Sequence, residues 1–444
     1  MNARWLLVVV GCVACGDNVP HDQVITALSG SRIALQIYRY DDGTEQPGSG
    51  ELYDKEQHGV CTAQAFVDGI VRCVPVGDEA VYVDAACSRL VGRALTIGSP
   101  THFIAHDAVS LLPARVFQAG GQTTPITQYY EKGGDRCFGP FGSPSDVPNF
   151  RLGAEVDAAS LVALHDDEVG AGRIAVMLRE TDDGLRLPLG LRDRDLDVGC
   201  TPALQIDGGI RCEPTEATAV SSYHDPGCHE PVVLVPNGVP PPKLATVLDS
   251  SGCTSYHTVG VEVTPQLYRL DNDTCSPLGL NPGLRVFSVE SAIETPVLGR
   301  TVEAIAGRRL QRIVLYEGDL RFMDQHLFDT ATRADCERFT FSDMARCVPA
   351  NLAATNTLFT MGCSMQVAVA QLPQRVCNRP VFAGNPTADG IEIRAIGDRV
   401  SGPLFQFDVG TCFQFVIPPD TDLRTLGPPI DPKAFVGAVY FGER

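Results

Sequence analysis

The 444-residue sequence has one tryptophan, four lysines and no apolar stretch long enough to cross a membrane. A membrane-spanning helix needs about 20 apolar residues. The run from Trp5 to Ala14 is shorter than that, and no later stretch is long enough. Because Trp5 lies in this run, the rest of the chain can stack sugars only on other aromatic side chains such as tyrosine.

Signatures of common catalytic sites are also missing. The sequence contains no G-x-S-x-G, H-E-x-x-H, G-x-x-x-x-G-K-[ST] or G-x-G-x-x-G motif. Its formal net charge is −19, and an acidic surface repels the phosphates of nucleic acid. We therefore predict no nucleic-acid partner and no cofactor. An enzyme is less expected than a binding protein, although missing motifs do not exclude one.

The first residues, MNARWLLVVVGCVACGDN, have the form of an export signal. One arginine precedes a short apolar run that ends in small residues and cysteine. This resembles a bacterial lipoprotein signal, in which a cysteine after a small residue is lipidated. We interpret residues 1–15 as signal peptide and lipobox, with Cys15 as the lipidated residue because it leaves the longer apolar run. Cys12 is the alternative, because the residues before it match the usual lipobox sequence more closely. A plain secretory signal is another alternative.

Cysteine is the informative residue type. Of 16 cysteines, 14 remain when Cys12 and Cys15 are set aside, and an even count in an exported chain indicates disulfides. Zinc would favour close C-x-x-C pairs, which do not occur beyond residue 15. The 14 predicted disulfide cysteines are Cys61, Cys73, Cys87, Cys137, Cys200, Cys212, Cys228, Cys253, Cys275, Cys336, Cys347, Cys363, Cys377 and Cys412.

Twelve of these cysteines form three sets of four with matching spacing. Corresponding cysteines in successive sets are 135 to 141 residues apart, which indicates a unit of about 137 residues present three times. Arg-Cys-x-Pro recurs with the second cysteine of each set, at Arg72, Arg211 and Arg346. We place the copies at residues 27–155, 156–293 and 294–444, and call them copies one, two and three.

Each copy is predicted to be mainly β. RIALQIY from Arg32 and RIAVML from Arg173 are short strands closed by Asp-Asp-Gly turns, with a fainter match, RIVLYEGD, from Arg312. Arg-Cys-x-Pro should end a strand that cysteine crosslinks and proline terminates. We expect the repeats to form a six-bladed β-propeller-like ring, with the tail KAFVGAVYFGER as a closing strand. Three tandem β-domains are the alternative, and a helix is possible at residues 302–314.

Pairing of the cysteines follows partly from this organisation. The first and second cysteines of each set flank a predicted hairpin turn, which suggests Cys61–Cys73 and its two counterparts. The third and fourth of each set can pair with each other. Cys253 and Cys377 have no counterpart in copy one, so they can bond together or change the pairing locally.

Few residues suggest chemistry. In YHDPGCHE, His224 and His229 flank a turn and, with Asp225, are weak candidates for a metal site. The alternative is a solvated hairpin. DRDLDVG at residues 193–199 and DNDT at residues 271–274 resemble calcium loops by carboxylate alternation, although neither has full EF-hand spacing. HDDE at residues 165–168 offers an acid–base pair without a nucleophile.

The repeated motifs resemble those of a group of uncharacterised bacterial surface lipoproteins. The best matches are Arg72-Cys73-Val74-Pro75 and the segment from Tyr82 to Cys87. Copy three departs from the pattern, with Leu358 and Thr360 where tyrosine and aspartate stand in the other copies. The resemblance covers nearly the whole mature chain and implies export and repeats, but no activity.

Together these observations predict a lipid-anchored protein of the outer membrane or cell surface, with a periplasmic or secreted protein as the alternative. We expect a binding or scaffolding module for protein or glycan. The alternative is an envelope hydrolase or lyase on a propeller scaffold. An enzyme should gather non-repeated residues such as His165, His224, His229 and His257 in one pocket, whereas a binding module should leave them scattered.

Overall fold

A computed structural model describes most of the chain after the predicted signal. The described residues are 24–95, 100–144, 146–205, 209–220, 222–248, 254–264, 266–271, 274–279, 282–360, 363–373, 380–408, 411–417 and 421–443. The predicted signal, including Cys12 and Cys15, lies outside this range, as do Cys253 and Cys377. Within it the chain is almost entirely β, as predicted, and its helical elements are two 3-10 turns, η1 (Ala158–Ser160) and η2 (Pro432–Ala434).

Four strands from each copy join in one 15-stranded sheet, which we call the hub. Copy one gives β1 (Ile33–Tyr40), β2 (Glu45–Asp54), β3 (Gly59–Ala65) and β4 (Val71–Pro75). Copy two gives β13 (Ile174–Glu180), β14 (Arg186–Asp193), β15 (Val198–Leu204) and β16 (Ile210–Pro214). Copy three gives β26 (Leu310–Glu317), β27 (Leu320–Asp329), β28 (Ala334–Thr340) and β29 (Ala345–Pro349).

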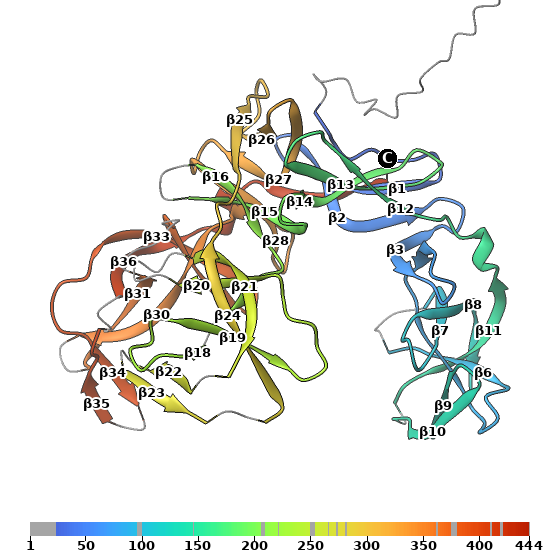
Figure 1. The fold of residues 1–444 in the computed structure, drawn as a ribbon. Helices are drawn as coiled ribbons and strands as arrows, with labels where there is room; N and C mark the ends of the chain where they lie inside the picture. Colours follow the sequence, from blue (N-terminus) through green and yellow to red (C-terminus); the bar gives the residue numbers. More distant parts are fainter. Residues whose placement is uncertain are drawn as a thin grey trace, which may run out of the picture.

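Three further strands join these groups into a closed ring. β25 (Val297–Glu303) pairs with β16 and β26, and β37 (Gly437–Glu443) pairs with β29 and β1. β12 (His165–Val169) pairs with β13, and residues 162–164 just before it exchange backbone hydrogen bonds with β4. The tail is therefore the closing strand that its sequence predicted, and Figure 1 shows the carboxyl terminus beside β1.

Each junction of the ring has its own apolar core. Leu185 and Leu187 of copy two pack with Ile33 of copy one. Ile313 of copy three packs with Ile174 of copy two. The third junction brings Tyr40 of copy one onto a cluster from copy three. Apolar burial across all three junctions stabilises the hub as one unit.

Acidic residues at the hairpin turns also connect the copies in a cycle. Asp183 of copy two accepts hydrogen bonds from the backbone N–H groups of Arg32 (2.6 Å) and Ile33 (2.9 Å) in copy one. Asp42 of copy one accepts one from copy three, at Leu310 (2.7 Å). Glu317 of copy three accepts one from copy two, at Ile174 (3.2 Å). Each copy therefore holds the first strand of a neighbouring copy.

The rest of each copy forms a separate outer sheet, and Figure 1 shows these sheets below the hub. Copy one supplies β5 (Asp78–Tyr82), β6 (Leu90–Arg93), β7 (His102–His106), β8 (Pro113–Thr123), β9 (Gln128–Gly133), β10 (Arg136–Gly142) and β11 (Asn149–Val156). Copy two supplies β17 (Thr218–Ala219), β18 (Ser222–Tyr223), β19 (Pro231–Pro236), β20 (Leu244–Leu248), β21 (Thr254–Val263), β22 (Leu267–Asp271), β23 (Thr274–Leu278) and β24 (Leu284–Ala292). Copy three supplies β30 (Leu352–Thr360), β31 (Met365–Pro373), β32 (Phe382–Thr387), β33 (Gly390–Arg399), β34 (Phe405–Asp408), β35 (Thr411–Gln414) and β36 (Thr421–Ile430).

Four expectations need correction. The six-bladed propeller is not shown, because the first halves of the copies share one sheet instead of making separate four-stranded blades. Strictly tandem domains fail for the same reason. The possible helix at residues 302–314 is wrong, since this segment is the hairpin of β25 and β26. The counterpart of Arg32 and Arg173 in copy three is Arg309, not Arg312, because Arg309 makes the equivalent ion pair, with Asp329.

Candidate functional site

The repeated Arg-Cys-x-Pro motif has a structural role in each copy. Arg72 and Arg346, both almost fully buried, each donate two hydrogen bonds of 2.7–2.8 Å to an aspartate in the preceding turn, Asp68 or Asp343. These bonds lower the pKa of both aspartates to about 2. Arg211 instead donates to the carbonyl of Thr295 (3.3 Å). The motif therefore supports the turn before it or the chain segment beside it.

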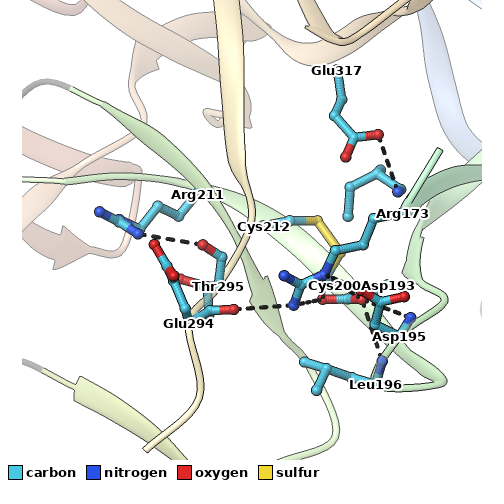
Figure 2. A network of polar contacts seen from close by, with 11 residues as sticks. Arg173, Asp193, Asp195, Leu196, Cys200, Arg211, Cys212, Glu294, Thr295 and Glu317 are labelled. Atoms are coloured by element: carbon cyan, nitrogen blue, oxygen red, sulfur yellow. Dashed lines mark hydrogen bonds and ion pairs between the residues drawn. A yellow bond between two sulfur atoms is a disulfide. The ribbon is translucent and has the colours of Figure 1, made fainter.

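The cysteine of each motif attaches the segment that returns from the outer sheet to the hub. In copy two, the N–H of Cys212 donates to the carbonyl of Pro296 (2.9 Å). Figure 2 shows how Arg173, which pairs with Asp193, also donates to the carbonyl of Glu294 (3.0 Å). The N–H groups of Cys73 and Cys347 make the equivalent bonds, to the carbonyls of Val162 and Val436 (both 3.0 Å).

Six disulfides crosslink the described residues in the pattern that the spacing suggested. In the hub they are Cys61–Cys73, Cys200–Cys212 and Cys336–Cys347. In the outer sheets they are Cys87–Cys137, Cys228–Cys275 and Cys363–Cys412. The third cysteine of each set has a positive φ, between 49° and 66°. Six disulfides indicate folding in an extracellular or other oxidising environment.

The histidines of YHDPGCHE pair with separate carboxylates. Nε2 of His224 lies 2.7 Å from Glu230, and Nδ1 of His229 lies 3.3 Å from Asp225. The Asp225 carboxylate also accepts backbone N–H groups of the turn, including that of Glu230 (2.7 Å), which lower its pKa. Among the residues that the structure describes, no group of three or more potential metal ligands occurs.

The other acidic motifs are engaged in ion pairs. Within residues 193–199, Asp193 and Asp195 both lie by Arg173, and Asp197 pairs with Arg192 and Lys243. The segment DNDT lies partly outside the described residues. In residues 165–168, Asp166 pairs with Arg179 of β13, and Glu168 pairs with Arg192 and Arg194. His257 instead contacts Ser255 and the carbonyl of Glu290 (both 3.0 Å).

A cleft of about 630 Å³ lies where copies two and three meet, and none of the histidines singled out above lines it. One wall is the β15–β16 hairpin of copy two, and another is formed by β25, β27 and β28 of copy three. Thr254 and Phe382 of the outer sheets also line the cleft, as do residues 349–351 at the end of β29 and residues 380–381 before β32. The volume lies within the range of small-molecule binding sites.

Charged side chains from both copies meet in this cleft. Arg300 forms an ion pair with Asp335. Nδ1 of His326 lies 3.0 Å from Asp324 on the same strand. Glu213, from copy two, accepts hydrogen bonds from the hydroxyl of Tyr256 (3.0 Å) and from Gln205 (2.8 Å).

The pKa values of two cleft residues are shifted. The hydrogen bond with Asp324 raises the pKa of His326, although burial opposes it. Burial raises the pKa of Asp335, and the Arg300 charge partly opposes this shift. Both shifts favour the protonated form of the side chain.

Apolar side chains supply the remainder of the lining. The Arg300 guanidinium lies 5.7 Å from the centre of the Phe328 ring. Phe382 lies at the copy-three wall beside Val381, which is 59% exposed. Leu204 and Ile210 contribute from the copy-two hairpin. Aromatic and aliphatic surface next to polar groups is typical of ligand sites.

Sequence reasoning missed these residues. The strands β27, β2 and β14 each end in a buried aspartate. The residue three positions before that aspartate is His326 in copy three, Glu51 in copy one and Gly190 in copy two, so the histidine is not repeated. A search for polar residues confined to one copy could have found the Asp324-x-His326 pair. It could not have shown that Arg300 and Glu213, from two different copies, face the same cleft.

The fold and the cleft define a disulfide-crosslinked, all-β repeat protein with a candidate ligand site between two repeats. A family model described as a family of unknown function, DUF7481, matches residues 8–435, and the chain belongs to this family. No curated protein and no solved structure matches the chain. In the described part of the chain, no helix has the length and hydrophobicity needed to span a membrane.

Proposed function

We propose that this protein is an exported, envelope-associated binding module whose ligand occupies the cleft between copies two and three. The observation that carries the proposal is the convergence of polar side chains from two copies, Arg300, Glu213 and the non-repeated His326, on one cleft. The arginines of the Arg-Cys-x-Pro motif are instead used to hold the fold together. A polar site absent from the repeat pattern is where a function added to a repeated scaffold should lie.

A glycan suits this cleft better than an extended peptide. Peptides commonly bind by adding a strand to a free sheet edge. The strands that line the cleft are each paired on two sides: β15, β16, β21, β25, β27, β28, β29 and β32. Recognition must therefore come from side chains, which here offer carboxylate, guanidinium, imidazole and amide groups beside phenylalanine rings. Such groups suit a ligand rich in hydroxyls.

A panel of glycans and peptides tests the proposal. Asn351 is an exposed cleft residue, and Asn351→Trp should fill part of the cleft and weaken ligand binding. The matched control is Asn385→Trp, an exposed position of copy three outside the cleft lining. Binding that both variants retain would refute a ligand site in this cleft. If Asn351→Trp weakens the binding of a peptide and of no glycan, the cleft remains the binding site but the glycan proposal is refuted.

The envelope location extends this proposal to the amino terminus. We propose that lipidation at Cys15, or alternatively at Cys12, attaches the protein to the outer membrane or cell surface. Ile25 bonds to Arg321 of the hub (2.9 Å), so an anchor there would attach at the hub. Radiolabelled fatty acid should be incorporated into the wild type and not into Cys15→Ser. Loss of the label only in Cys12→Ser would identify Cys12 as the lipidated residue. No label in the wild type would indicate a periplasmic or secreted protein.

A hydrolase or lyase is a second candidate because the cleft holds a carboxyl group suited to proton donation. Burial raises the pKa of Asp335, as is common for general acids. Product formation from any bound glycan, abolished in Asp335→Asn while binding persists, would favour the enzyme. Binding of a glycan without product formation would support the binding module instead.

A further inference from the structure

We propose that the cleft selects acidic glycans, and that Arg333 pairs with their carboxylate. This inference rests on the proposed function, because it names the ligand class of the same cleft. Arg333 lies in the turn between β27 and β28 and contributes to the cleft lining. Uronic acids, sugars that carry a carboxylate, are the chemical class in question.

Among the described residues that line the cleft, one cationic side chain has no ion-pair partner. Arg300 is already paired with Asp335, and His326 lies against Asp324. Glu213 is held by hydrogen bonds from uncharged groups. Arg333 is exposed and makes no ion pair with another described residue. A ligand carboxylate would therefore meet a guanidinium that does not have to give up an existing partner.

The turn itself does not require arginine at position 333. Arg333 has a φ of 53°, and the equivalent turns of copies one and two place His58 (52°) and Asp197 (55°) in the same conformation. Three different side chains thus satisfy one backbone geometry. The presence of arginine at position 333 is explained better by the cleft that its side chain lines.

Guanidinium and carboxylate groups match in geometry as well as in charge. Arginine can donate two parallel hydrogen bonds to one carboxylate. The protein as a whole carries a net charge of −19, which repels acidic ligands. Attraction must therefore be local, so affinity should depend strongly on Arg333 and should fall as salt is added.

The experiment compares acidic glycans with uncharged versions of the same shape. Galacturonate, glucuronate and mannuronate trimers, each paired with its methyl ester, are titrated into the oxidised mature protein by calorimetry. We expect at least one acid to bind about tenfold more tightly than its ester. Arg333→Asn, which tolerates positive φ, should remove this preference, and Arg333→Lys should keep part of it. Arg321→Asn, on β27 but outside the cleft lining, should leave it unchanged.

The outcomes separate this inference from the proposed function. If no acid binds better than its ester, or if Arg333→Asn keeps the preference with unchanged thermal stability, acid selection by Arg333 is refuted. Neutral glycan binding lost in Asn351→Trp would still support the cleft as a binding site. If Asn351→Trp affects no ligand, the proposed function itself fails.

Discussion

The ion pair between Arg173 and the buried carboxylate of Asp193 should contribute more to stability than an exposed pair of the same geometry. Asp193 is 1% exposed, accepts two hydrogen bonds from Arg173 (3.0 and 2.7 Å) and also accepts the N–H groups of Asp195 and Leu196. Asp193→Asn keeps the shape and removes the charge. Hydrogen bonds to charged groups contribute about 1.5–3 kcal/mol and neutral ones about 1 kcal/mol. With two bonds weakened, the free energy of unfolding should fall by about 1 to 4 kcal/mol.

The chain provides a matched control for this prediction. Arg179 donates two hydrogen bonds of 2.7 and 2.8 Å to Asp166, but Asp166 is 46% exposed. Asp166→Asn should therefore cost less than about 1 kcal/mol. Urea unfolding of the oxidised mature protein, followed by circular dichroism, measures both variants. Equal losses in the two variants would refute the argument that burial makes the repeated pair strong.

Three further predictions concern the rest of the scaffold. Asp183→Ala leaves two N–H groups of copy one without their acceptor, and should lower the free energy of unfolding by about 3 kcal/mol in the same assay; an unchanged midpoint would contradict the cyclic contacts. Hydrogen bonds from arginine lower the pKa of Asp68 and Asp343 from 3.8 to about 2, so stability should be lost as pH falls from about 4 to about 2, because the unfolded chain binds protons first. Flat stability over that range would argue against both pairs. Replacing Cys61 and Cys73 together by serine should cost about 2–4 kcal/mol, and no change in the urea midpoint would refute a stabilising role for that disulfide.

Local spacing predicted the crosslinks well because each hub disulfide spans a single hairpin. Cys61 and Cys73 lie on adjacent strands, β3 and β4, so their separation in sequence carried the information. Arg-Cys-x-Pro was read as a strand end for the same reason. In the structure, Arg72 and Arg346 pair with acids and Arg211 donates to a backbone carbonyl.

The ring and the cleft depend on contacts that local patterns do not encode. A strand such as β25 is equally suited to a partner in its own copy or in a neighbouring one, and in the structure it pairs with one of each. The propeller prediction was wrong because strands of different copies pair in one sheet. Arg300 and Glu213 are 87 residues apart in the sequence and come together only because the copies share a sheet.

Closure of the ring by β37 also determines how late the hub can finish folding. β1 and β37 are separated by about four hundred residues, so their pairing is among the most non-local contacts in the chain, and such contacts form slowly. Each outer sheet, in contrast, uses one continuous segment and can fold as soon as that segment is available. During export, β1 would therefore stay an unpaired edge on one side until β37 arrives. Aggregation at that stage, more than the stability of the finished fold, should limit the yield of carboxyl-terminal truncations.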